Sequence, residues 1–255
     1  MPDSINLPDR YKLIFLDTVG STNDELKSRV LSSPVEEGLV IWSLTQTAGK
    51  GRNKRLWVSD IGNMYLSVLF RPNCNIFDAA QIGFLPVIAA KQTLQQLAGH
   101  SIKMSYKWPN DLLLNKKKVG GTLLEAGFDK QTQMVWVVVG FGLNLKNFPS
   151  ETGFPATSIQ DETGLELNVE EVVELYLNNL SKLYSCWQKN GFDPVRKKWL
   201  SCGHALHDTL RIKLGDKEIE GSFRDLDEKG ALVIETNDGL RHIAAGDVYS
   251  LPTRG

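Results

Sequence analysis

Residues 102–128, IKMSYKWPNDLLLNKKKVGGTLLEAGF, contain three strand-like segments separated only by a proline turn and a basic turn. Strands joined by such short turns pair antiparallel, because two parallel strands need a long crossover connection. This run therefore predicts an α+β fold with a mixed or antiparallel sheet, and it argues against a doubly wound parallel sheet.

Further strands and three helices are expected around this run. Strand patterns occupy residues 11–19, 38–47, 63–72 and 133–145, and helical patterns occupy residues 21–33, 76–99 and 168–190. Ser21 or Thr22 is suited to cap the first helix, Gly99 is suited to end the second, and Pro86 is a candidate kink within it. Residues 149–167 are rich in Gly, Pro, Thr and Asp, which predicts a loop.

The last fifty residues have a different pattern from the rest of the chain. From about Leu206, short alternating segments are each closed by a turn signal such as GD, EKG or NDG. Such spacing predicts a small all-β module. With the boundary near Ser201 to His207, we expect a catalytic domain in residues 1–202 and a small β domain in residues 203–255.

Charge and cysteine content limit the classes of function. The chain carries 29 Lys and Arg against 30 Asp and Glu, a net charge of −1, so the basic stretch Ala48–Trp57 is a local feature. A local basic loop favours a small anionic ligand over nucleic acid, which needs a broad basic face. No signal peptide is evident at the start, and the longest apolar run is too short to span a bilayer. Scattered Cys74, Cys186 and Cys202 indicate reduced thiols and a cytoplasmic location.

The basic stretch, AGKGRNKRLW, combines features of an anion-binding loop. Gly49 and Gly51 allow backbone N–H groups to approach a phosphate or carboxylate closely. Its cations are Lys50, Arg52, Lys54 and Arg55. Trp57 could stack on a flat heterocycle. A solvated hairpin tip is the alternative, and the P-loop pattern GxxxxGK[ST] does not occur in the chain.

The stretch KWPNDLLLNKKKVGG offers a second group of candidate residues. Pro109 fixes a turn, and Asn110 and Asp111 either complete that turn or face a nucleotide or its metal ion. The lysines Lys116–Lys118 form either a solvated turn or a turn with one lysine directed inward. Both interpretations remain open from these residues alone.

Two other motifs suggest chemistry less strongly. GFGLNL begins like a dinucleotide-binding fingerprint, but its third glycine and following helix are missing, so a buried strand end that directs Asn144 into a pocket is the better interpretation. Cys202, His204 and His207 are residue types that bind zinc, but no second cluster completes four ligands. We therefore expect no metal site in the protein.

Taken in order, the stretches STN, TQTAGKGRNKRLW, GNMYLSVLFRP, KWPNDLLLNKKKVGGTLLE and VVVGFGLNL resemble the biotin protein ligase family, also called biotin–[acetyl-CoA-carboxylase] ligases or holocarboxylase synthetases. The resemblance covers nearly the whole chain. It implies a catalytic domain like that of class II aminoacyl-tRNA synthetases, followed by a small SH3-like β-barrel domain.

The resemblance also implies a two-step reaction. Biotin and ATP would form biotinyl-5′-AMP and pyrophosphate, and a lysine of a biotin carboxyl carrier protein, in acetyl-CoA carboxylase or a related carboxylase, would then take the biotin. Mg²⁺ would be held mainly by the nucleotide phosphates. The cations would offset repulsion between a carboxylate and a triphosphate, and a mobile loop would shield the anhydride from water.

The family motifs assign roles to particular residues. The resemblance implies catalytic roles for Lys118, Arg52 and Lys50. It implies that biotin is bound by Ser21, Thr22, Asn23, Gln46, Gly49, Lys50, Gly51, Arg52, Lys118, Gly120 and Gly121. It implies that the nucleotide is bound by Arg52, Arg55, Trp57, Asn110, Asp111, Lys118 and Asn144.

The chain departs from the commonest bacterial members at two points. Their loop reads GRGRRGR, whereas GKGRNKR here places Asn53 and Lys54 where an arginine and a flexible glycine are usual. We therefore expect altered loop kinetics and altered retention of the adenylate. The first catalytic strand begins at Tyr11, which leaves no room for the DNA-binding domain of some relatives, so nucleic acid is not an expected partner. Membrane is not an expected partner either, because the longest apolar run is too short to span a bilayer.

Two other functions and a homodimer are also considered from the sequence. A lipoate ligase-like acyl-adenylate transferase is the alternative enzyme, and a non-catalytic sensor of biotin or its adenylate is the alternative binding protein. The cysteine nucleophile of octanoyltransferases is not evident, because Cys74 and Cys186 have no His or Lys motif beside them. A homodimer could form if the strand QMVWVVVG were an exposed edge.

Overall fold

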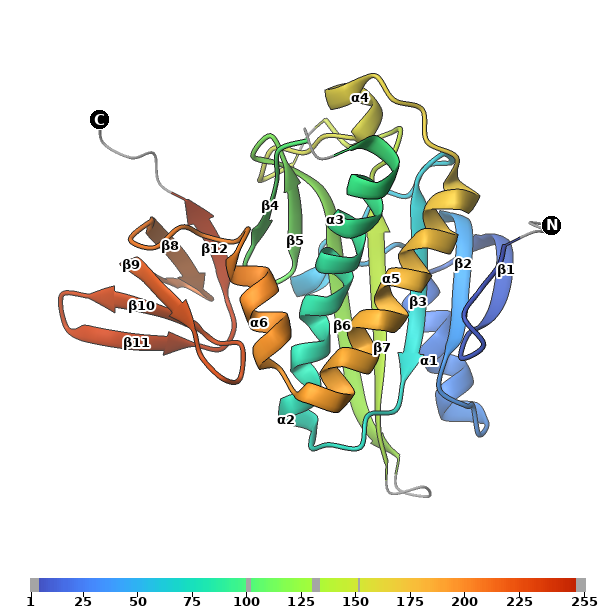
Figure 1. Cartoon of the computed structure of the whole chain (residues 1–255), viewed down its shortest axis with the longest axis horizontal. Helices are drawn as coiled ribbons and strands as arrows, with labels where there is room; N and C mark the ends of the chain where they lie inside the picture. The colour runs from blue at the N-terminus through green and yellow to red at the C-terminus, as the bar shows by residue number, and fades with distance from the viewer. Residues whose placement is uncertain (1–4, 100–101, 130–133, 151, 251–255) are drawn as a thin grey trace.

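The computed structural model describes residues 5–99, 102–129, 134–150 and 152–250. Its larger sheet has seven strands in the order β1-β2-β3-β7-β6-β5-β4 (Figure 1). The strands are β1 Lys12–Val19, β2 Leu39–Gln46, β3 Met64–Phe70, β4 Met104–Lys107, β5 Asp111–Leu114, β6 Lys117–Asp129 and β7 Met134–Leu143. β1 and β2 pair parallel, and each other neighbouring pair is antiparallel. The predicted mixed sheet is therefore confirmed.

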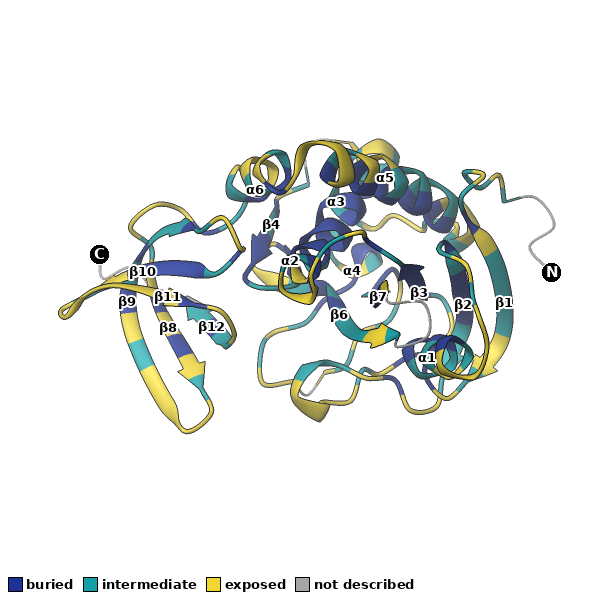
Figure 2. Ribbon diagram, turned by 90° about the horizontal axis from the view of Figure 1, so that it is seen from below, coloured by how far each residue is buried: buried dark blue, intermediate teal, exposed yellow. Residues whose placement is uncertain are grey.

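Helices cover both faces of this sheet, and successive side chains of a strand point alternately to the two covered faces. The covering helices are α1 Thr22–Ser32 on one face and α3 Leu85–Ala98 with α5 Val169–Asn190 on the other (Figures 1 and 2). Within β2, Val40 and Trp42 belong to the main core, whereas Ile41 packs in a second core with Leu26 of α1. This period of two is what a strand needs when both of its faces are buried.

Some helix boundaries differ from the expectations. The predicted helix of residues 76–99 consists of α2 Ile76–Ala79, a 3₁₀ segment η2 Ala80–Phe84, and α3. Pro86 lies in the first turn of α3, where its missing N–H removes no helical hydrogen bond, so the expected kink is wrong. The predicted loop of residues 149–167 contains the short helix α4 Ile159–Thr163, and α6 Asp193–Leu200 was not predicted.

The strand considered for dimerisation lies inside the sheet. β7 pairs with β3 on one side and with β6 on the other, so its edges are already hydrogen-bonded. The outer strands of the sheet are β1 and β4. The expectation of a homodimer through an exposed β7 edge is therefore wrong; Gln133, at the start of that predicted strand, lies outside the described residues.

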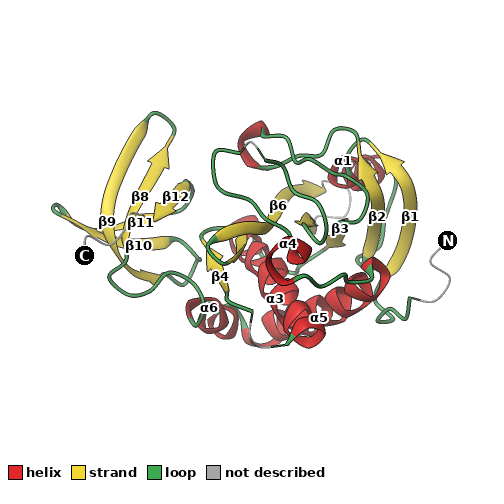
Figure 3. Cartoon of the chain, turned by 90° about the horizontal axis from the view of Figure 1, so that it is seen from above, coloured by secondary structure: helices red, strands yellow, loops and turns green. Residues whose placement is uncertain are grey.

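A second, smaller sheet follows α6 and is antiparallel throughout, in the order β11-β10-β9-β8-β12. Its strands are β8 Thr209–Leu214, β9 Lys217–Leu226, β10 Leu232–Thr236, β11 Gly239–Ile243 and β12 Asp247–Ser250. The sheet lies beside β4 and α6, at the end of the molecule opposite β1 (Figures 1 and 3). This arrangement confirms the small β module, and we propose the domain division at residues 1–202 and 203–255. Among the described residues, no helix is long and apolar enough to cross a bilayer.

Candidate functional site

A cavity of about 330 Å³ lies where the N-terminus of α1, the basic loop, the β5–β6 hairpin and β12 meet. Most of the residues predicted from sequence line it. They are Ser21, Thr22, Asn23, Gln46, Lys50, Gly51, Arg52, Arg55, Trp57, Asn110, Asp111, Lys118, Gly121 and Asn144. Segments more than a hundred residues apart in the chain therefore build one site.

Neutral polar groups line the end of the cavity near α1. Ser21 is the N-cap of α1, and its hydroxyl accepts a hydrogen bond from the Asp24 N–H. The N–H of Thr22 donates to Gln46 Oε1 at 2.8 Å, and Gln46 Nε2 donates to Ser59 Oγ at 2.9 Å. Because these groups carry no net charge, this end suits a neutral ligand that both donates and accepts hydrogen bonds.

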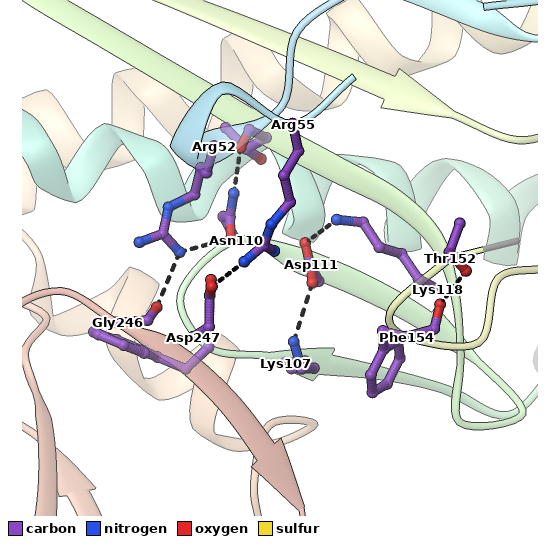
Figure 4. Close-up of polar contacts among 12 residues, drawn as sticks. Arg52, Arg55, Lys107, Asn110, Asp111, Lys118, Thr152, Phe154, Gly246 and Asp247 are labelled. Carbon is purple, nitrogen blue, oxygen red and sulfur yellow. Dashed lines mark hydrogen bonds and ion pairs between the residues drawn. The ribbon is translucent and has the colours of Figure 1, made fainter. Parts of the chain in front are cut away.

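A buried carboxylate between two lysines forms the floor of the cavity (Figure 4). Asp111 lies 2.6 Å from Lys118 Nζ and 3.3 Å from Lys107 Nζ. Burial by itself raises the pKa of Asp111, but the two lysines outweigh it and hold this pKa below its usual value. Burial lowers the pKa of Lys107. The floor therefore fixes two cations at one carboxylate, on the neighbouring strands β4, β5 and β6.

Two neighbouring lysines of the basic turn, Lys117 and Lys118, point in different directions. Asn115 and Lys116 adopt the left-handed backbone of a tight hairpin turn. Lys117 points outward to Glu162, 2.8 Å away, whereas Lys118 points inward to the cavity. Asn115, Lys117 and Thr157 together lower the pKa of Glu162 to about 2. The alternative of one inward lysine is thus confirmed, and that lysine is Lys118.

The basic loop is held above the floor by contacts to α1, to the start of β12 and to the turn between β4 and β5. Lys50 Nζ lies 2.5 Å from Asp24 of α1, and Arg55 pairs with Asp247 of β12. Arg52 donates to the carbonyl of Gly246 at 3.2 Å and to Asn110 Oδ1 at 3.4 Å. Figure 4 shows Arg52 and Arg55 reaching from the loop toward these partners.

Two residues at the tip of the loop have an unusual backbone. Asn53 and Lys54 adopt φ angles of 53° and 59°, in the left-handed region that glycine prefers. The sequence resemblance implies a glycine at the position of Lys54, so a lysine here adopts a backbone conformation that glycine favours. A lysine there costs conformational free energy on the order of 1 kcal/mol.

Trp57 and Asn144 also line the cavity. The ring of Trp57 covers Gly142 so closely that a Cβ there would lie 2.5 Å from the indole. Trp57 Nε1 is buried without a hydrogen-bond partner among the described residues, and Lys118 Nζ lies 5.2 Å from the ring centroid. Asn144 Nδ2 donates to the carbonyl of Thr157 at 3.0 Å.

Several residues of the cavity were not predicted. They include Lys107, Gly140, Gly142, Asp247 and Tyr249. Lys107 is spaced four residues from Asp111, and Gly140 and Gly142 belong to GFGLNL, so these three carried a signal in the sequence. Asp247 and Tyr249 carried none, because only the packing of the second sheet brings them to the site.

Gly49 and Gly120 do not line the cavity. A Cβ on Gly49 would lie 2.3 Å from the Trp57 carbonyl oxygen, and one on Gly120 would lie 3.0 Å from the Gly142 carbonyl oxygen. Both glycines therefore allow close backbone packing behind the site.

The CGHALH motif has structural partners. The Trp108 N–H donates to His204 Nε2 at 3.3 Å, Cys202 Sγ lies 2.7 Å from Lys91 Nζ, and His207 contacts Arg224. Within the described ranges, no three His, Cys, Asp or Glu side chains are grouped to hold a metal ion.

Comparison with known proteins identifies two family regions. Residues 15–142 match the biotin/lipoate A/B protein ligase family, and residues 210–250 match the biotin protein ligase C-terminal domain. The first region contains most of the cavity-lining residues, and the second contains Asp247 and Tyr249.

Individual relatives agree with this assignment. A biotin–[acetyl-CoA-carboxylase] ligase of Paracoccus denitrificans is 35% identical over 80% of this chain and 87% of its own length. The bifunctional ligase/repressor BirA of Bacillus subtilis is 30% identical over 92% of this chain and 73% of its own length. A solved structure of biotin protein ligase from Aquifex aeolicus, in complex with biotin and ATP, is 28% identical with a TM-score of 0.78, and the match covers 94% of this chain and 99% of that chain. The chain therefore belongs to the biotin protein ligase family and is a biotin ligase.

Proposed function

We propose that the protein activates biotin with ATP to give biotinyl-5′-AMP and pyrophosphate, and then transfers biotin to a lysine of a biotin carboxyl carrier protein. The observation that carries this proposal is the position of Lys118. Its ammonium group is fixed by buried Asp111 and lines the same cavity as the neutral polar end and the cationic loop. A carboxylate and a phosphate could therefore meet beside it.

The biotin ring would occupy the neutral end of the cavity. Its ureido group is uncharged and both donates and accepts hydrogen bonds, which matches Ser21, Thr22, Asn23 and Gln46. A buried ureido group without such partners would be strongly unfavourable. The biotin carboxylate would then point toward Lys118.

The nucleotide would occupy the end formed by the loop and β12. Arg52 and Arg55 offer cations to the phosphates, Trp57 offers an aromatic face, and Asn110 and Asn144 offer amides. The Aquifex relative was solved with biotin and ATP together, which supports two adjacent ligands in this fold.

In the first step, a biotin carboxylate oxygen attacks the α-phosphorus, and the bond from that phosphorus to the pyrophosphate oxygen breaks. Negative charge builds on the oxygens around phosphorus as the two anions meet. Lys118, Lys50 and Arg52 would stabilise that charge, and preorganised cations act strongly in a site with little water. In the second step, the nitrogen of a neutral acceptor lysine attacks the anhydride carbonyl and forms the amide bond. The bond from that carbonyl carbon to the phosphate oxygen breaks, AMP leaves with the bonding electrons, and the nitrogen releases a proton to water.

Magnesium would be bound mainly through the triphosphate. Within the described residues, no cluster of three carboxylate, His or Cys side chains offers an all-protein cage. Mg²⁺ commonly keeps several waters and binds substrate phosphates with few protein ligands. ATP in this site would therefore bring the ion with it.

The small β domain would complete the nucleotide end. Asp247 pairs with Arg55, and Tyr249 lies 5.8 Å from Lys107 Nζ, measured to its ring centroid. Both residues line the cavity.

We also propose a cytoplasmic location, where the carboxylase acceptors and reduced cysteines would be found.

The transfer step can be tested by mass spectrometry with a purified biotin carboxyl carrier domain of acetyl-CoA carboxylase, biotin and MgATP. The expected result is a mass gain of one biotin on a single lysine, and no gain when that lysine is replaced by arginine. Labelling by lipoate in place of biotin would assign the chain to the lipoate ligase alternative. Absence of labelling by either acid would contradict the ligase proposal and favour a sensor.

A further inference from the structure

The Asn23 side chain is held in part from behind the cavity, by Glu125 and Ser67, which do not line it. Asn23 is buried, with 3% of its surface exposed. Its Nδ2 donates to Glu125 Oε2 at 2.9 Å and to the Leu123 carbonyl at 3.3 Å. Its Oδ1 lies 2.6 Å from the hydroxyl of Ser67. Glu125 and Ser67 lie on β6 and β3, outside the cavity lining.

These contacts fix which way the Asn23 amide points. An ionised carboxylate can only accept hydrogen bonds, so Glu125 requires the NH₂ side of the amide. The carbonyl side must then face Ser67 and Gly140, where an added Cβ would lie 2.2 Å from Asn23 Oδ1. Glu125 and the more distant Leu123 carbonyl, which also can only accept, therefore remove the ambiguity that an asparagine amide otherwise has.

This orientation is connected to the other predicted biotin residues. The Ser67 hydroxyl also lies 2.8 Å from Thr22 Oγ1, and Thr22 Oγ1 lies 3.2 Å from Gln46 Oε1. Gln46 Nε2 donates to Ser59 Oγ. Ser59 Oγ donates in turn to the Trp57 carbonyl at 3.0 Å, so the hydrogen bonds run from Glu125 across the neutral end of the cavity to the end of the basic loop.

The charge of Glu125 has a partner of its own. Lys27 Nζ lies 2.5 Å from Glu125 Oε1, the oxygen that Asn23 does not contact, and 3.3 Å from Asp24. The side chains of Lys27 and Glu125 are 24% and 29% exposed, so water also reaches this pair. The ion pair and the amide contact use different oxygens, which allows them to be separated by mutation.

We propose that Glu125 is a positioning residue for biotin recognition. It acts through Asn23, whose amide it locks in one orientation, and so it sets the arrangement of donors and acceptors that meets the ureido ring. This proposal rests on the proposed function, because it requires biotin at the neutral end of the cavity.

The test compares Glu125→Gln with Lys27→Met in biotin-dependent pyrophosphate release. Both variants lose the ion pair, but only Glu125→Gln replaces the acceptor at 2.9 Å by a group that can also donate. The amide orientation then depends on the longer contact to the Leu123 carbonyl at 3.3 Å. We expect Glu125→Gln to raise KM for biotin about tenfold, with kcat and KM for ATP within about threefold of wild type. Lys27→Met should keep KM for biotin within about twofold, because the carboxylate remains.

Glu25→Gln is the matched control. Glu25 lies on α1 between Asn23 and Lys27, and it pairs with Arg29 outside this network. It should leave each constant unchanged, and thermal melts should show that all three variants fold. Equal rises in KM for biotin in Glu125→Gln and Lys27→Met, or no rise in Glu125→Gln, would overturn the positioning role. Absence of biotin-dependent release in wild type would instead refute the proposed function.

Discussion

The cations of the site belong to two regions that hold them in different ways. On the sheet floor, the side chains of Lys107 and Asp111 are only 10% and 11% exposed, and Lys118 is 27% exposed. On the basic loop, Lys50 and Arg55 are 46% and 59% exposed, although they too pair with carboxylates. Buried pairs are costly to break, whereas exposed pairs contribute little. The floor therefore presents fixed charge, and the loop presents charge that can change partners.

This difference fits the two tasks of the proposed reaction. The point where carboxylate and phosphate meet needs a cation that is in place before the substrates arrive. The cover over the adenylate must open for substrates and close afterwards, so its contacts must be weak. Four predictions follow from assigning these tasks to the floor and the loop.

The largest effect is expected for a cation of the floor. Lys118→Ala should lower biotin-dependent pyrophosphate release by about 100- to 1,000-fold, the range seen when one preorganised charge-stabilising group is removed. Lys117→Ala is the matched control, because Lys117 is adjacent and points outward to Glu162. It should stay within about twofold of wild type. A Lys118→Ala rate within threefold of wild type would remove this residue from the chemistry.

A second effect concerns the rigid connection between the floor and the small β domain. Burial lowers the pKa of His204 to about 4, and its Nε2 accepts from the Trp108 N–H, which a protonated ring could not do. Since the unfolded pKa is near 6.5, the unfolded state binds more protons between these values. Stability is fully present above pH 6.5 and should fall by about 3 kcal/mol as pH decreases to 4.

Urea unfolding of wild type and His204→Asn at pH 7 and pH 4 would measure this contribution. The asparagine can accept the same hydrogen bond without titrating. The free energy of unfolding of the variant should therefore fall less than that of wild type between pH 7 and pH 4. Equal losses in both proteins would show that His204 is not the group responsible.

A third effect is expected in the loop. Arg52 contacts both Asn110 and the Gly246 carbonyl, so it joins the loop to the floor and to the small β domain. Arg52→Gly should increase the dissociation rate of biotinyl-5′-AMP about tenfold, as expected for loss of one charged hydrogen-bonding group. Stopped-flow release of the adenylate, together with labelling of bystander lysines, would measure it. An unchanged rate with labelling confined to the carrier would refute a retaining role for the loop.

The smallest effect is expected for the ion pair between Arg55, which is 59% exposed, and Asp247, which is 15% exposed. Asp247→Asn weakens the contact to Arg55 and should change the free energy of unfolding by less than about 1 kcal/mol. It should nevertheless make trypsin cleave faster after the loop cations, because the loop loses a partner on β12. Unchanged cleavage would show that Asp247 does not hold the loop.

Much of this fold could be predicted from local pattern. The hairpins of residues 104–129 were evident from WPND and NKKK, because turn residues at fixed spacing leave few alternatives. The position of β7 within the sheet could not be predicted, because a buried apolar strand has the same sequence pattern at an edge as in the middle of a sheet. Helices α4 and α6 are only 5 and 8 residues long, too short for a clear periodicity.

The site was predictable to the extent that its residues lie in recognisable motifs. Lys118 could be named from the resemblance, but its choice over Lys117 depends on the register of β6 against β5. Tertiary packing alone brings Asp247 and Tyr249 to the cavity. It also brings Glu125 to Asn23, which lines the cavity. Contacts between distant segments leave no periodic signal in a single sequence, so these residues required the structure.

Pyrophosphate release from MgATP, without any acceptor protein, tests the central claim most directly. It would be measured with biotin, with lipoate, with octanoate and with no acid. The account predicts release with biotin alone, limited to about one equivalent because the closed loop retains the adenylate. Release with lipoate but not biotin, or no release with any acid, would contradict the claim that this cavity joins a biotin carboxylate to the α-phosphate of ATP.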